Sequence, residues 1–128
     1  MDTVLWVGLG GFLGANARYA IGTWLASRLG TAFPAGTLVI NVSGSLVVGI
    51  LLVLLTERLA APPVWRLLLV VGFLGGYTTF SSYAFEVLDL LERGAWVRGL
   101  WYVLGSNGLS LAACAAGMGL ARLLPAGR

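Results

Sequence analysis

The chain has 128 residues, of which 59% are hydrophobic and only 10% are charged, with a net charge of +3. This balance lies outside the range of soluble domains and inside that of membrane proteins. With no histidine and a single cysteine, Cys114, the chain offers no internal disulfide and no plausible zinc or iron site. Its arginines are scattered beside apolar runs, which does not support nucleic-acid binding.

Four apolar stretches are each long enough to cross a bilayer as a helix, which takes about 20 residues. They run approximately over residues 4–29, 37–55, 65–91 and 97–124, and short separators rich in glycine and proline divide them. We therefore expect an all-α integral membrane protein with four transmembrane helices, forming a single domain over residues 1–128.

Positive charge is almost equally divided between the two membrane faces. Four arginines fall on the face that carries both termini: Arg58, Arg66, Arg122 and Arg128. Three fall on the other: Arg28, Arg93 and Arg98. Either this weak bias still sets one orientation, or the chain inserts both ways. The second alternative, dual topology, would permit an antiparallel homodimer.

Two of the spans carry polar residues at helical spacing. One stripe consists of Thr37, Asn41 and Ser45, and the other of Tyr102, Ser106 and Ser110. Residues four apart share a helix face. A single stripe would indicate hydrogen bonding between helices. Two stripes, together with the third span, favour a polar pathway.

The third span contains a glycine-rich segment, residues 72–83, near its middle. Three glycines and the adjacent Thr78 and Thr79 weaken a helix, which predicts a break at bilayer depth. Freed carbonyls would suit a hard cation, whereas freed N–H groups and hydroxyls would suit an anion. The alternative is an unbroken, kinked helix that packs closely through Gly72 and Gly76.

Phe80 and Tyr83 share a helix face in this span, and their electropositive ring edges can contact an anion. Arg18 is the basic residue deep within a span. It either draws anions into a vestibule, pairs with Glu86, or extends to the membrane surface. For Glu86 we expect a solvated position near the end of the third span, as for Asp89 and Glu92.

The buried polar groups are mostly hydroxyls, amides and ring edges, all of which donate to an anion. A small, strongly hydrated anion needs many such donors to replace its water. No acidic residue is clearly placed at the midplane to carry a proton or cation cycle. The sequence therefore favours passive anion conduction, without naming the anion.

Three segments resemble the signatures of the Fluc/CrcB fluoride channel family: residues 11–19 (GFLGANARY), 36–44 (GTLVINVSG) and 72–83 (GFLGGYTTFSSY). The likeness spans essentially the whole chain in the family's order. It implies a multi-pass protein of the cell membrane that releases fluoride passively and so lowers its toxicity. It further implies an antiparallel dual-topology homodimer in lipid, with two pores and a structural, non-conducted Na⁺ on the dimer axis.

The resemblance also implies roles for individual residues. Backbone carbonyls of Gly75 and Thr78 would hold the Na⁺. The expected anion pathway comprises Arg18, Asn41, Thr79, Phe80, Ser81, Ser82, Tyr83, Tyr102, Ser106 and Ser110. The family usually has phenylalanine where this chain has Tyr83, whose hydroxyl would add a donor and an acceptor.

Three other classes of protein compete with a channel. A small multidrug-type transporter is also built of four short helices, but its family needs a glutamate in the first helix, where this chain has Arg18. A membrane assembly factor without transport activity would tolerate a charge at Asn41. An enzyme would need a nucleophile–base pair, and no histidine is present.

Overall fold

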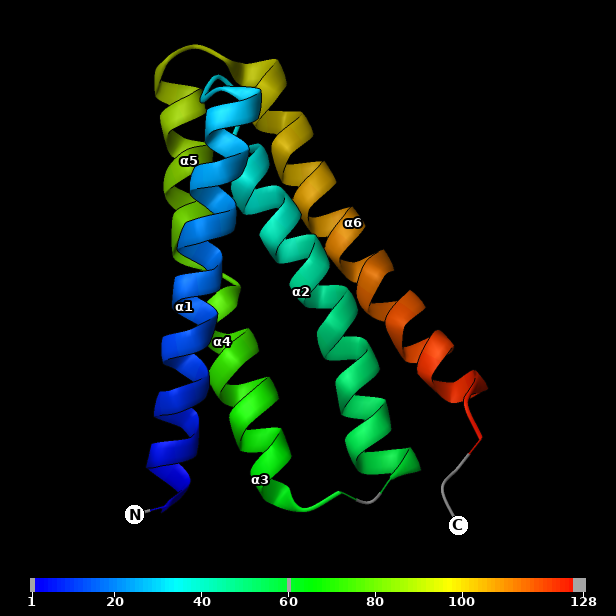
Figure 1. Ribbon diagram of the computed structural model, residues 1–128. Coiled ribbons are helices and arrows are strands. Elements are labelled where there is room, and N and C mark those ends of the chain that lie inside the picture. The colour runs from blue at the N-terminus through cyan, green and yellow to red at the C-terminus, as the bar shows by residue number, and fades with distance from the viewer. Residues whose placement is uncertain (1, 60, 126–128) are drawn as a thin grey trace.

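The computed structural model describes residues 2–59 and 61–125, and in this part of the chain all regular structure is helical. The elements are α1 (Asp2–Leu29), α2 (Ala35–Val53), η1 (Leu54–Arg58), α3 (Pro63–Trp65), η2 (Arg66–Leu74), α4 (Gly75–Tyr77), α5 (Phe80–Glu92) and α6 (Trp96–Leu123). The π-helical η1 continues α2, and the π-helical η2 joins α3 to α4. The elements thus form four long rods, the third of them broken (Figure 1). The predicted all-α fold is confirmed.

Three of the rods are long and apolar enough to cross a membrane: Ala35–Arg58, Pro63–Glu92 and Trp96–Leu123. Large apolar side chains such as Phe12, Val71 and Leu111 point outward, as lipid contact requires. The 28-residue α1 is not among the three, because its five glycines, Asn16 and Arg18 lower its hydropathy. Three helices long and apolar enough to cross a membrane are therefore confirmed, and the crossing by α1 stays a prediction.

Glycines let α1 approach the first half of the broken rod closely. A Cβ atom added at Gly14 would overlap the carbonyl of Phe73, and one added at Gly76 would lie only 2.7 Å from the carbonyl oxygen of Gly11. Small residues at this spacing allow helix backbones to touch in membranes. The close packing through Gly72 and Gly76 therefore occurs together with the break, not instead of it.

A second glycine contact joins α2 to α6, the two helices that run side by side along the other flank (Figure 1). A Cβ atom at Gly49 would overlap the carbonyl of Cys114, and one at Gly117 would overlap that of Leu46. Gly30 and Gly94 have positive φ values of 77° and 73° just after α1 and α5. Each reverses the chain at a helix end, as glycine does at this position.

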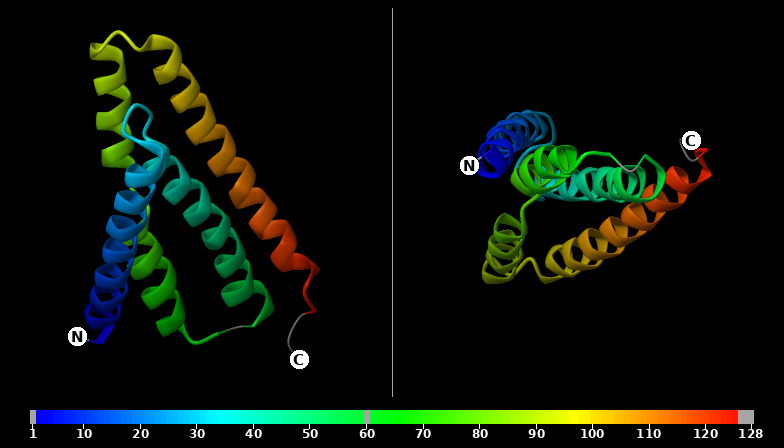
Figure 2. Two further views of the ribbon diagram at one scale, coloured as in Figure 1. Left: turned by 45° about the horizontal axis from the view of Figure 1, so that its top comes forward. Right: turned by 90° about the horizontal axis from the view of Figure 1, so that it is seen from below.

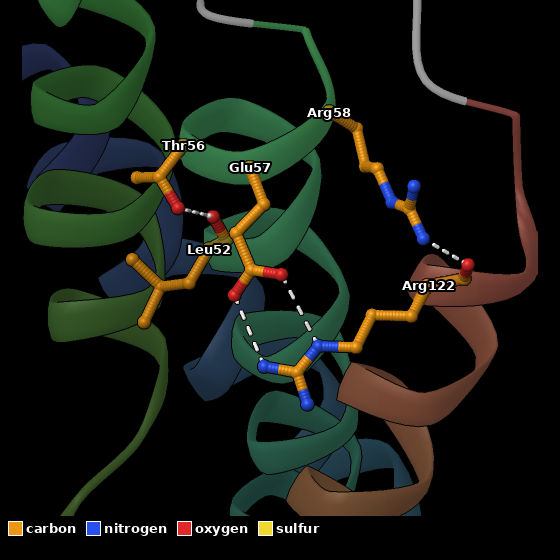
Figure 3. A network of polar contacts seen from close by, with 5 residues as sticks. All are labelled: Leu52, Thr56, Glu57, Arg58 and Arg122. Carbon is orange, nitrogen blue, oxygen red and sulfur yellow. Dashed lines mark hydrogen bonds and ion pairs between the residues drawn. The ribbon is translucent and has the colours of Figure 1, made fainter.

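The ends of α6 and of the α2–η1 rod are tied together by polar contacts (Figure 3). The Glu57 carboxylate accepts from Nε and Nη2 of Arg122, at 3.1 and 3.0 Å. The Arg58 guanidinium donates to the carbonyl of Arg122. The described chain begins and ends on this side of the molecule (Figure 1), as an even number of spans predicts. Arg128 lies outside the described residues.

The broken rod does not run straight. At Thr78 and Thr79 the chain steps sideways, so that α5 lies out of line with η2 and α4 and leans toward α6 (Figure 2). A small buried core of Ile40, Leu74 and Tyr77 packs the first half of the rod against α2. The step leaves polar groups of three helices facing a common space.

Candidate functional site at the helix break

The break consists of two residues with extended backbone. Thr78 has φ −77° and ψ 156°, and Thr79 has φ −150° and ψ 120°. The Thr79 side chain then caps α5 by accepting from the backbone N–H of Ser82 at 3.2 Å. Extended residues turn the following N–H groups away from the carbonyls at the end of α4. The predicted helix break is therefore confirmed.

Asn41 of α2 binds the backbone at this break. Its Nδ2 donates to the Thr79 carbonyl at 2.9 Å, and its Oδ1 accepts from the Thr79 N–H at 2.8 Å. In a continuous helix that N–H would have donated to the carbonyl of Gly75. Asn41 thus stabilises the break, and the Gly75 carbonyl loses its helical partner.

A cavity of about 470 Å³ lies beside the break. Among the described residues its lining contains no acidic or basic side chain. Its polar lining residues are Asn41, Ser45, Thr78, Thr79, Tyr83, Ser106, Asn107 and Ser110. The Oγ of Ser106 is buried and has no hydrogen-bond partner in the described chain. A buried hydroxyl without a partner is costly, so it indicates a site for a polar ligand.

Aromatic rings form a row that starts at this cavity. Phe80 and Tyr83 both line the cavity, with their ring centroids 5.5 Å apart and the planes tilted by 51°. Tyr83 contacts Tyr102 at 5.3 Å, and Tyr102 meets Phe33 edge-on at 5.5 Å. The row links the cavity to a second one of about 790 Å³, which Phe33 lines.

Glu86 is a polar residue of this region that the sequence interpretation placed wrongly. Its carboxylate accepts from the hydroxyl of Thr37 at 2.7 Å and from that of Tyr102 at 2.6 Å, and it is only partly exposed. The expected solvated position is corrected, because the sideways step of α5 brings Glu86 between α2 and α6. Asp89, one turn further on, instead pairs with Arg93 at 2.9 Å.

Arg18 lines the larger, 790 Å³ cavity, together with Glu86, Asp89, Arg93 and Arg98. Its Nη1 donates to the Thr78 carbonyl at 3.4 Å. Pairing with Glu86, one of the alternatives for Arg18, is not observed in the described chain, where the Glu86 carboxylate accepts from Thr37 and Tyr102. Arg18 places a positive charge on one side of the break.

The structure brings together most of the residues expected in the pathway. Those on the smaller cavity are Asn41, Thr79, Phe80, Tyr83, Ser106 and Ser110, with Gly75 and Thr78. Ser82 and Arg18 line the larger cavity, and Tyr102, a member of the aromatic row, donates to Glu86. Ser81 lines neither cavity and lies 3.3 Å from the Thr79 hydroxyl. Asn107 was not expected on the cavity.

Helices of membrane length around a broken helix, with hydroxyl and amide groups lining a cavity at the break, define a multi-pass membrane protein. Residues 5–118 match the family described as CrcB-like protein, Camphor Resistance (CrcB). The chain belongs to this CrcB family, which also includes the proteins named FluC.

Similar proteins match nearly end to end. One from Roseiflexus sp. (strain RS-1), a "Fluoride-specific ion channel FluC", is 47% identical over 95% of this chain and 98% of its own length. One of the same name from Rhizobium meliloti is 44% identical over 97% of this chain and 99% of its own length. A third of that name, from Solibacter usitatus, is 52% identical over 92% of this chain and 97% of its own length.

Proposed function

We propose that this chain is the subunit of a fluoride-specific ion channel, through which fluoride leaves the cell passively, and that it is not an enzyme. The observation that carries the proposal is the 470 Å³ cavity at the helix break. Its polar lining consists of hydroxyl and amide groups, with no acidic or basic side chain among the described residues. Relatives of nearly equal length bear the name of fluoride-specific channels.

Fluoride holds its water shell tightly, so a channel must offer many donors in its place. Ser106 has a buried hydroxyl without a partner in the described chain, and Ser110 lines the same cavity one turn further along α6. Asn41 uses one N–H on Thr79 and has a second N–H left to donate. Ring edges of Phe80 and Tyr83 add weaker positive contacts.

The path proposed for the ion joins the two cavities through the aromatic row. The Thr79 hydroxyl lies 3.3 Å from that of Ser81 and 3.1 Å from that of Ser82, which makes a cluster of hydroxyls at the start of α5. Arg18 attracts the anion to the larger cavity, and Tyr102 lies between the cavities. These residues therefore complete the pathway that begins at Asn41.

The functional unit proposed here is an antiparallel homodimer with two pores. Phe80 lines the 470 Å³ cavity although 77% of its surface is exposed in one chain. A second copy facing this side would cover Phe80 and close the cavity against lipid. The nearly equal arginine counts on the two faces are compatible with insertion in both orientations.

The carbonyl groups at the break partly fit the structural Na⁺ implied by the family resemblance. The described chain contains no cluster of carboxylate, histidine or cysteine ligands, so the oxygens would come from the backbone. Gly75 and Thr78 line the cavity, and Gly75 lacks its helical donor. Within the described part of the chain, the Thr78 carbonyl accepts a long, 3.4 Å bond from Arg18. Two copies of the chain would supply four such oxygens to an ion that holds the two subunits together.

The experiment is fluoride efflux from liposomes that contain the purified protein, measured with a fluoride electrode and without a proton gradient. A passive channel releases the trapped fluoride once a counter-ion can move. The rival small multidrug-type transporter would require a counter-transported proton. Efflux that depends strictly on a proton gradient would contradict the proposal.

A further inference from the structure

We propose that the Tyr83 hydroxyl donates a hydrogen bond to the anion in the cavity and that Asn107 positions it to do so. The proposal rests on the anion conduction proposed above and adds two specific roles to it. Both side chains line the 470 Å³ cavity, Tyr83 from α5 and Asn107 from α6. Their polar atoms are in contact, with Asn107 Nδ2 2.8 Å from the Tyr83 oxygen.

The direction of this hydrogen bond follows from a second contact of Asn107. The same Nδ2 lies 2.8 Å from the backbone carbonyl of Val103. A carbonyl only accepts, so the nitrogen of the amide, not its oxygen, must occupy this position. The amide therefore donates its two hydrogens to Val103 and Tyr83, and the tyrosine oxygen is an acceptor.

An accepting tyrosine oxygen keeps its own proton for another partner. In residues 2–59 and 61–125 the Tyr83 hydroxyl donates to no protein acceptor. The ring packs against those of Phe80 and Tyr102, whose centroids lie 5.5 and 5.3 Å from its own. The available donor is thus carried by a packed ring beside the cavity that Ser106 and Ser110 also line.

A phenol is a stronger hydrogen-bond donor than an aliphatic hydroxyl, because its proton is more acidic. Fluoride is the strongest acceptor among the halides, so a phenol in the pathway favours fluoride more than chloride. Accepting a bond from Asn107 strengthens the donation further, since chained hydrogen bonds polarise one another. Tyr83 and Asn107 would act as one unit on the ion.

The test is the dependence of efflux on fluoride concentration for the wild type, Tyr83→Phe, Asn107→Leu and the double variant. Both single variants should raise the half-saturating fluoride concentration about three- to tenfold, the size of one neutral hydrogen bond. The double variant should match Tyr83→Phe within about twofold, because both changes remove the same interaction.

Non-additivity separates positioning from a structural role. If Asn107 acted only through Val103, Asn107→Leu would weaken efflux by the same factor whether Tyr83 is present or replaced, so additive effects would overturn the proposal. If Tyr83→Phe had the same half-saturating fluoride concentration as the wild type, the inference would also be overturned, while the proposed fluoride conduction would stand. A wild-type protein that releases no fluoride would overturn the proposed function and this inference together. Elution on size exclusion verifies that each variant is folded.

Discussion

The side-chain amide of Asn41 pairs with both backbone polar groups of Thr79, at 2.9 Å to the carbonyl and 2.8 Å to the N–H. One residue of α2 thereby satisfies the N–H and the carbonyl of Thr79, whose N–H no longer has a helical partner. At bilayer depth there is little water to do this, and an unpaired group costs several kcal/mol. The same residue borders the cavity, so the break and the donors around it depend on one side chain.

Asn41→Asp should abolish fluoride efflux while the protein still assembles. The carboxylate still accepts from the Thr79 N–H but brings a negative charge to the anion cavity. At a separation of about 4 Å, two like charges repel by about 4 kcal/mol at an effective dielectric constant of about 20, enough for a hundredfold loss or more. Efflux assays and size exclusion measure the two properties. Efflux like that of the wild type would remove Asn41 from the pathway.

Gly14→Ala should destabilise the protein because its methyl group would overlap the Phe73 carbonyl. Overpacking of this kind costs about 1–3 kcal/mol, of which alanine's better helix propensity recovers up to about 1 kcal/mol. Gly8→Ala is the matched control on the same helix, since no atom lies within 4 Å of a Cβ there. Thermal unfolding in detergent should give a lower Tm for Gly14→Ala alone. Equal Tm values would contradict the packing of α1.

Glu86→Ala should lower stability because Thr37 and Tyr102 would lose the acceptor that they share. A buried hydroxyl left without a partner, as that of Tyr102 would be, costs about 1–3 kcal/mol, and the loss at the half-buried Thr37 should be smaller. Glu86→Gln retains one acceptor oxygen and should lie between the wild type and the alanine variant in Tm. A Glu86→Ala protein as stable as the wild type would mean that water replaces the carboxylate.

Glu57→Gln should change neither stability nor efflux noticeably. The ion pair of Glu57 with Arg122 is well formed (Figure 3), but the two side chains are 47% and 49% exposed. Exposed ion pairs contribute about 0–1 kcal/mol. The measurement is Tm at low and high salt. A drop of more than about 5 °C at low salt alone would show that the pair stabilises the protein more than its exposure indicates.

Local sequence signals were sufficient to predict the helices and the break. Adjacent β-branched threonines have low helix propensity, so Thr78 and Thr79 mark the break without any knowledge of the fold, whereas the glycines of α1 and α4 stay helical. Likewise, the spacing of Asn41 and Ser45, and of Ser106 and Ser110, places each pair on one helix face, and all four side chains line the cavity.

Residues whose positions depend on how helices cross were not predictable in this way. Glu86 lies near the end of the third span in sequence, yet the sideways step of α5 places it between Thr37 and Tyr102. Asn107 lies one position off the stripe of Ser106 and Ser110, and the reach of the Tyr83 hydroxyl brings it into the site. Both depend on tertiary contacts rather than on periodicity.

The central claim is that buried donors at the helix break replace the water shell of a small anion. The most direct measurement is the release of fluoride and of chloride from proteoliposomes under identical gradients. We predict rapid release of fluoride and retention of chloride. Fluoride that stays trapped, or chloride that leaves equally fast, would contradict the claim.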